Sequence, residues 1–173
     1  AKNVYLKNLN KIENCENLNF LNLDENSGID LGDRSLENCT NLKGLSISNV
    51  NLNSVGITAF YGLNNLKELI LENSKILKLN FYLPNSLEIL RLSRNVLTID
   101  SDSFKNLINL KEIYINQEDY YGFQIEDNFD KNSVYFLENL EILDISNRGI
   151  TAQNFPIFQN SKIFIKKLIQ FWK

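Results

Sequence analysis

The stretch LEILRLSRNVLTIDSDSFKNLINL, residues 87–110, decides the fold of this chain. Its first nine residues carry leucine at relative positions 1, 4 and 6, and this apolar pattern recurs at an interval close to 24 residues. The six copies begin at Leu18, Leu42, Leu66, Leu87, Leu110 and Leu140. Such a period predicts a single stacked domain over residues 1–173, because neighbouring copies share one core.

Positions 4 and 6 of each copy predict a short strand. Side chains two residues apart on a strand point to the same side, so Leu90 and Leu92 would point inward and Arg91 outward. One such strand cannot cover its apolar side, whereas parallel copies stacked side by side can. We therefore expect one curved sheet whose concave face carries positions 2, 3, 5, 7 and 8.

The return half of each copy places an aromatic residue shortly before a leucine. Phe60 and Phe104 occupy this place in two copies, and either Tyr135 or Phe136 in a third. A wider arc needs larger side chains, so these residues predict packing on the convex side of the core.

Residues 87–110 resemble the typical-class leucine-rich repeat, LxxLxLxxNxLxxIxxxxFxxLxxL, and similar repeats cover roughly 12–150. The resemblance implies an α/β fold, a right-handed solenoid with a concave parallel β-sheet and an irregular or short-helical convex side. It also implies protein recognition, as in the extracellular repeats of Toll-like receptors, Slit proteins and bacterial internalins.

Position 9 departs from the pattern of that family. The family usually has asparagine there, and here only Asn26 and Asn95 fit, while Asn49, Asn73 and Asn147 lie one place earlier. Either the turn is locally shifted, or other polar contacts replace the buried asparagine ladder.

Cys15 and Cys39 occupy the same slot in successive copies. Later copies have leucine in this slot, which favours two buried thiols acting as small hydrophobic side chains. A disulfide is the alternative, because adjacent coils of a solenoid lie about 5 Å apart. The spacing alone leaves both open.

The first candidate binding surface is the centre of the concave face. Position 5 places Ile70, Arg91 and Tyr114 on three successive strands, and tyrosine and arginine are favoured at protein interfaces. The predicted rim consists of Glu72, Arg94 and Gln117. The alternative is that variable solvent-facing positions produce such a trio by chance.

The second candidate is an insertion in residues 116–133, where the interval between copies grows to 30 residues. It is acidic and aromatic, and we take Asp119 and Tyr121 as candidate contacts because loops on a rigid scaffold often carry recognition. Some of its aromatic residues, such as Tyr120 and Phe123, would instead replace core positions of the repeat.

Residues 151–173 are predicted to form a partial repeat or cap. Ile163 and Ile165 could open a seventh strand, and a terminal cap would cover the last coil. The alternative for this basic, apolar end is a helix that binds a membrane surface or a partner.

The composition argues against an enzyme and against a nucleic-acid binder. The chain has no histidine and no glycine-rich phosphate loop, so we expect no catalytic residues, cofactor or metal. The net charge of −3 disfavours nucleic acid, and no apolar run reaches the roughly 18 residues of a membrane span. We expect a module that binds another protein, from a secreted or cell-surface receptor or adhesion protein. The alternative is a cytoplasmic scaffold, or an arm of a larger protein whose activity lies elsewhere.

Overall fold

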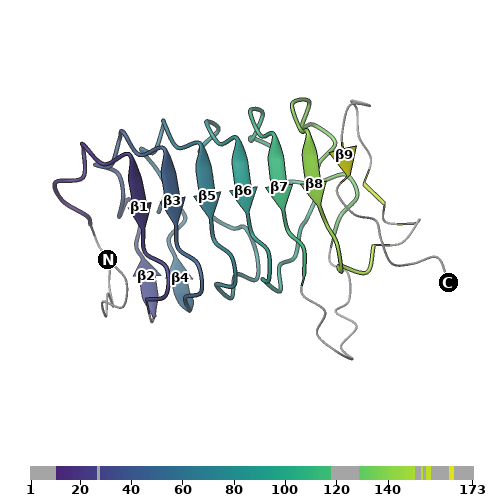
Figure 1. The fold of residues 1–173 in the computed structure, drawn as a ribbon, viewed down its shortest axis with the longest axis horizontal. Helices are drawn as coiled ribbons and strands as arrows, with labels where there is room; N and C mark the ends of the chain where they lie inside the picture. Colours follow the sequence, from purple (N-terminus) through teal and green to yellow (C-terminus); the bar gives the residue numbers. More distant parts are fainter. Residues whose placement is uncertain are drawn as a thin grey trace.

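The computed structural model describes residues 11–26, 28–117, 129–150, 153, 155–156 and 164–165. Its main feature is a seven-stranded parallel sheet in the order β1-β3-β5-β6-β7-β8-β9 (Figure 1). The strands are β1 (Phe20–Asn22), β3 (Gly44–Ser46), β5 (Glu68–Ile70), β6 (Ile89–Arg91), β7 (Glu112–Tyr114), β8 (Ile142–Asp144) and β9 (Phe164–Ile165). Each strand pairs with the next coil of the chain, so the chain winds as a solenoid and the predicted leucine-rich architecture is confirmed.

The register of the sheet aligns equivalent positions of every copy. Leu21 pairs with Leu45, Leu45 pairs with Leu69, and Leu69 pairs with Leu90. Strand β9 continues the sheet, since Leu143 pairs with Ile165, and this part of the seventh strand was predicted. Each strand is only two or three residues long, because the chain turns away from the sheet after position 6.

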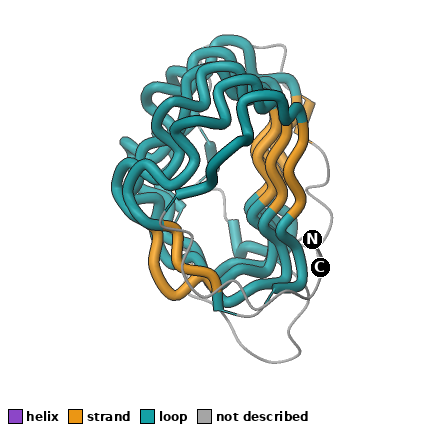
Figure 2. The backbone as a smooth tube through the Cα atoms, turned by 90° about the vertical axis from the view of Figure 1, so that its left-hand side faces the viewer, coloured by secondary structure: helices purple, strands orange, loops and turns teal. Residues whose placement is uncertain are grey.

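The core is the column of inward side chains that the copies share. Leu69, Leu90 and Ile113, all at position 4, are fully buried. Position 1 is buried from Leu42 onward, whereas Leu18 of the first described coil remains 38% exposed. In the view along the solenoid, the main strands line one side of a tube and loops form the opposite side (Figure 2). Core side chains fill this tube.

The return segments contain no helix in the part of the chain that the structure describes, so they take the irregular form of the two forms expected. They carry a second, two-stranded parallel sheet of β2 (Ile29–Leu31) and β4 (Leu52–Val55), seen below β1 and β3 in Figure 1. Single bridges between Lys78 and Thr98, and between Ile99 and Phe129, extend this contact to later coils.

The convex side of the core is packed as predicted at two of three places. Phe60 and Phe104 are fully buried. The prediction for the sixth copy was wrong, because Val134 fills the equivalent slot while Phe136 is 58% exposed. Tyr135 and Phe136 follow this inward slot in the sequence, and their rings pack edge to face on each other.

Asparagines that precede the first leucine of a copy join neighbouring coils. The side-chain amides of Asn41 and Asn65 donate to the backbone oxygens of Glu16 and Thr40, at 2.7 and 2.9 Å. The amides of Asn109 and Asn139 bond the coil before them in the same way. This ladder gives carbonyl groups of the irregular returns a hydrogen-bond donor. The repeat pattern did not predict it.

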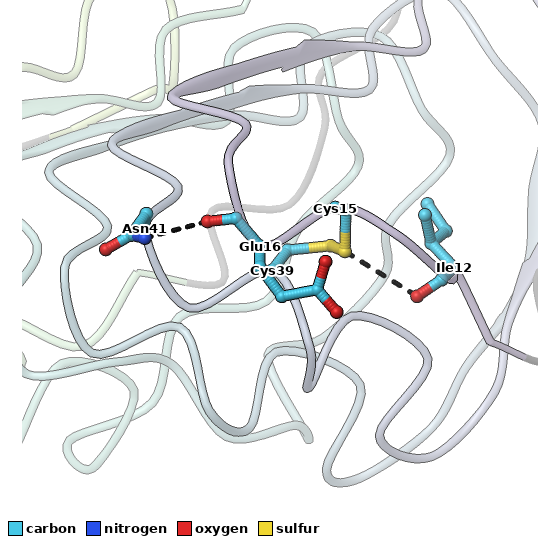
Figure 3. The surroundings of a disulfide bond; sticks show 5 residues. All are labelled: Ile12, Cys15, Glu16, Cys39 and Asn41. Carbon is cyan, nitrogen blue, oxygen red and sulfur yellow. Dashed lines mark hydrogen bonds between the residues drawn. A yellow bond between two sulfur atoms is a disulfide. The ribbon is translucent and has the colours of Figure 1, made fainter.

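Cys15 and Cys39 form a disulfide with a Cα separation of 4.8 Å. The alternative of two buried free thiols, which the leucine in later copies favoured, is therefore wrong. Both half-cystines are fully buried, and the Cys15 sulfur also lies 3.5 Å from the backbone oxygen of Ile12 (Figure 3). Because equivalent slots lie one coil apart, the bond ties the first described coil to the second.

Candidate functional site

The outward side chains at positions 3, 5 and 7 form one continuous surface, which we call the sheet face. The three columns share the strands whose inward residues build the core, so their backbone is held rigidly from behind. The columns are Phe20, Gly44, Glu68, Ile89, Glu112 and Ile142 at position 3; Asn22, Ser46, Ile70, Arg91, Tyr114 and Asp144 at position 5; and Asp24, Ser48, Glu72, Ser93, Asn116 and Ser146 at position 7.

Ile70, Arg91 and Tyr114 lie together at the centre of the sheet face. The register pairs Ile70 with Arg91, and Arg91 with Tyr114, so the predicted trio stands on three adjacent strands. All three residues are partly exposed. The structure thus brings together the residues proposed from position 5.

Arg91 and Tyr114 form a stacked pair on this face. The guanidinium carbon of Arg91 lies 4.1 Å from the centroid of the Tyr114 ring, close enough for a cation–π interaction. Arg91 Nε lies 3.5 Å from a carboxylate oxygen of Glu68 on the neighbouring strand. The arginine side chain is therefore held between two strands while 31% of it remains exposed.

The Tyr114 hydroxyl is held by the same network. It donates a 2.8 Å hydrogen bond to a carboxylate oxygen of Glu112. Partial burial raises the pKa of the phenol, and the bond to Glu112 raises that pKa further. The hydroxyl therefore stays protonated at neutral pH, and the Tyr114 ring is held in place by Glu112 and Arg91.

A row of lysines at position 2 borders the sheet face, and we call it the lysine edge: Lys43, Lys67 and Lys111. Glu88 accepts hydrogen bonds from two of them, from Lys111 at 2.7 Å and Lys67 at 2.8 Å. The bond from Lys111, and then that from Lys67, lowers the pKa of Glu88 to about 2. This edge is thus fixed across three successive coils.

Aspartates fix the two ends of the sheet face. Asp24 accepts hydrogen bonds from the Ser46 hydroxyl at 2.6 Å and from the Ser48 backbone at 2.7 Å. Asp144 accepts a 2.8 Å bond from the Asn116 amide and a further bond from the Ser146 hydroxyl. Each aspartate thus bonds a neighbouring coil, and Asp144 also bonds within its own turn. These bonds hold the polar side chains of the face in place.

The predicted rim residues differ in where they lie. Glu72 is partly exposed at position 7, and Arg94 is exposed at position 8 with a left-handed backbone conformation, φ 61°. The prediction for Gln117 was wrong, because only 9% of this residue is exposed. Its amide points inward and donates to the backbone oxygen of Asn95. Asp119 and Tyr121 lie outside the described residues, as does most of the insertion.

Gln117 stands at position 8, next to position 9, which points into the core in the other copies. In the other copies this position is buried, at Asn26, Val50, Ser74, Asn95 and Arg148. The residue before it adopts a positive φ in five copies, at Glu25, Asn49, Asn73, Arg94 and Asn147. The turn is therefore not shifted in those copies. Polar contacts of Ser74 and Arg148 replace the asparagine in two of them, and the apolar Val50 replaces it in a third. In the fifth copy position 9 lies outside the described residues, and Gln117 at position 8 points inward.

Arg148 has a structural role that the repeat pattern did not predict. It is 7% exposed, and its guanidinium donates to the backbone oxygens of Leu97 at 2.7 Å and Ile115 at 3.3 Å. The side chain thus joins the fourth, fifth and sixth coils where residues 116–133 interrupt the repeat. The available signal was a long polar residue at a position that is normally inward.

The described part of the chain has no helix long and apolar enough to cross a membrane. It also has no group of three or more histidine, cysteine, aspartate or glutamate side chains that could hold a metal ion. The sheet face offers a guanidinium stacked on an aromatic ring and fixed carboxylates, and the lysine edge beside it offers ammonium groups. These are the means of non-covalent recognition.

Comparison with known proteins agrees with this architecture. A family described as BspA type leucine rich repeat region matches residues 8–128 with six copies. Toll-like receptor 7 of Mus musculus is 28% identical over 85 residues, which cover 47% of this chain and 8% of the receptor. The chain thus matches only a small part of that relative. Repeats of this kind generally form non-enzymatic protein-interaction modules. Because the family match spans well over half of the sequence, the chain belongs to the BspA-type leucine-rich repeat family.

Proposed function

We propose that this chain is a non-enzymatic recognition module that binds another protein through the sheet face, with Ile70, Arg91 and Tyr114 at the centre of the contact. The observation that carries the proposal is the stacked Arg91–Tyr114 pair, which is held in place by Glu68 and Glu112 yet remains partly exposed. Pre-ordered aromatic and arginine side chains are the kind that contribute most to protein interfaces.

Glu72 and Arg94 would form the polar rim of this contact. Both lie past the C-terminal end of their strands, beyond the central trio, and both are accessible to solvent. Residues 116–133, with Asp119 and Tyr121, would add a second contact beside the fifth coil, because an insertion in a repeat emerges as a loop at the side of the stack.

We further propose that the parent protein is secreted or displayed on a cell surface, as a receptor or adhesion protein. The buried Cys15–Cys39 disulfide supports this, since disulfides persist mainly in oxidising compartments. The similarity to part of Toll-like receptor 7 points in the same direction. A cytoplasmic scaffold would leave the disulfide without a physical reason to persist.

The proposal is tested by comparing two double variants that remove the same side chains from different surfaces. Arg34 and Tyr61 on the return side form a second stacked pair at 4.7 Å, and Arg34 also pairs with Glu37, much as Arg91 pairs with Glu68. Arg34→Ala/Tyr61→Ala is therefore a matched control for Arg91→Ala/Tyr114→Ala.

Proteins captured by the wild type from the extract and surface fraction of its source are quantified against both variants. We expect a specific partner to be lost from Arg91→Ala/Tyr114→Ala and kept by the control, with both variants folded by circular dichroism. A partner kept by both variants, or lost equally from both, would contradict binding through the sheet face.

A further inference from the structure

The negative charge of the chain is concentrated on the sheet face. Its three columns carry five acidic residues and one basic residue, which are Asp24, Glu68, Glu72, Glu112 and Asp144 against Arg91. The whole chain has 21 acidic and 18 basic residues, so 16 acidic and 17 basic residues lie elsewhere. The formal charge is therefore −4 on the sheet face and +1 on the rest of the chain. Position 8 adds one residue of each sign, Glu25 and Arg94, and leaves this difference unchanged.

The single cation of the sheet face, Arg91, already interacts with residues of the same face. Arg91 is paired with Glu68 and stacked on Tyr114, and it forms the only ion pair of these three columns among the described residues. The remaining carboxylates belong to the first, third, fifth and sixth copies. At a strand spacing of about 4.8 Å, they spread over roughly 24 Å along the solenoid axis.

Apolar side chains alternate with carboxylates at position 3. Along the axis this column reads Phe20, Gly44, Glu68, Ile89, Glu112 and Ile142. Phe20 is 71% exposed, and its ring lies directly over Gly44, where an added Cβ would stand only 2.6 Å from Phe20 Cδ1. The glycine thus leaves room for this aromatic ring, which stays exposed to solvent.

Arginine side chains match this alternation of rings, aliphatic groups and carboxylates. A guanidinium stacks on an aromatic face, pairs with a carboxylate in a fixed geometry, and carries a long apolar stem. Position 2, on one side of the face, carries three lysines against Glu88 and Glu141, so it adds a formal charge of only +1 beside the −4 of the face.

We infer that the sheet face docks a basic, arginine-bearing segment of a partner protein that runs across the strands along the solenoid axis. The inference rests on the proposed function, because it gives the chemistry of the partner that the same face would bind. Charge complementarity selects this occupant: an acidic segment would meet a surface of −4.

The test uses octaarginine labelled with fluorescein, whose extended length of roughly 27 Å matches the sheet. Fluorescence anisotropy gives its affinity for the wild type, with labelled octaglutamate as the opposite probe. We expect octaarginine to bind more weakly as salt is added, and octaglutamate not to bind.

Two double variants, each lacking two negative charges, distinguish an effect of the sheet face from an effect of the overall charge of the chain. Glu72→Gln/Glu112→Gln acts on the sheet face, and glutamine at 112 can still accept the bond from Tyr114. Glu16→Gln/Asp102→Asn removes two exposed acidic residues outside the sheet face. We expect the first to weaken octaarginine binding about fivefold or more and the second less than about twofold. Equal weakening by both variants, or no octaarginine binding at low salt, would overturn the inference.

The same variants distinguish failure of this inference from failure of the proposed function. If the captured natural partner is lost from Arg91→Ala/Tyr114→Ala but kept by Glu72→Gln/Glu112→Gln, the sheet face binds a partner that is not basic. If the partner is kept by both, the sheet face is not the binding surface, and the proposed function fails with the inference.

Discussion

The two sides of the same strands differ in how strictly they repeat. On the inward side, positions 4 and 6 are leucine or isoleucine in every copy, and those from the second copy onward are buried almost completely. On the outward side, position 5 changes from Ile70 to Arg91 to Tyr114 on successive strands. The inward side must fit its neighbours, whereas the outward side contacts solvent. Outward residues can therefore change without altering the shared core.

The largest expected effect tests whether the inward side is one shared core. Leu69→Ala should lower the free energy of unfolding by about 2–5 kcal/mol, because Leu69 is fully buried between two coils. Leu21→Ala should cost less, since Leu21 is only partly buried in the first described coil. Urea unfolding of both variants checks this, and equal losses would show that the coils do not share a core as described.

A second effect concerns the bond that joins the first two coils. Cys15→Ala/Cys39→Ala should destabilise the chain by about 3 kcal/mol, because the disulfide closes a loop of about 24 residues in the unfolded state. The measurement is urea unfolding with and without reductant. Reductant should lower the midpoint of the wild type and leave the variant unchanged. A wild-type midpoint that does not respond would contradict a stabilising disulfide.

The buried polar column at position 9 offers a smaller change. Asn95 donates from its amide to the backbone oxygens of Leu71 and Leu92 and accepts from the backbone of Ser74 and Ile76. Asn95→Ala should cost about 1–3 kcal/mol, because these buried groups would lose their partner. Asn64→Ala, at an exposed asparagine of the return, is the control and should be close to neutral. A neutral Asn95→Ala would show that water replaces the amide.

The sequence was sufficient for the inward columns and insufficient for several single positions. Period 2 within a strand and period 24 between copies fix which leucines meet, so the register from Leu21 to Leu143 was predictable. Cysteine fits the same slot as leucine, so the disulfide was not. Gln117 was missed because position 8 is exposed in the other copies. Arg148 was missed because a charged side chain is seldom expected at a buried position such as position 9. Val134 stands six residues before Leu140, where Phe60 and Phe104 stand before their leucines, so the prediction of Tyr135 or Phe136 lay one or two positions too late.

The outward columns could be located but not interpreted from the sequence. Positions 3, 5 and 7 follow from strand geometry, so the adjacency of Ile70, Arg91 and Tyr114 was predictable. The stacking of Arg91 on Tyr114 and the placement of Phe20 over Gly44 depend on side-chain conformations, which no period specifies. Binding of a partner by Glu72, Arg94 or the central trio stays a prediction.

The smallest effect tests the outward side alone. The folded-state pKa of Glu88 is about 2, below the ordinary value of 4.5, so its bonds to Lys67 and Lys111 stabilise the folded chain above pH 4.5. This contribution is lost as the pH falls from about 4.5 to 2, and it should remain below about 1 kcal/mol because the groups are exposed. Glu88→Gln should therefore converge in stability with the wild type over that range. A constant difference in urea midpoint would contradict the assignment.

The most direct test of the separation between the two sides uses adjacent residues of β6. Thermal melting of Leu90→Ala and Arg91→Ala is compared with the wild type under the same conditions. Leu90→Ala should lower the melting temperature by about 4–15 °C, and Arg91→Ala by less than about 3 °C. Equal losses, or a larger loss for Arg91→Ala, would contradict a solenoid whose inward side holds the fold and whose outward side is available for binding.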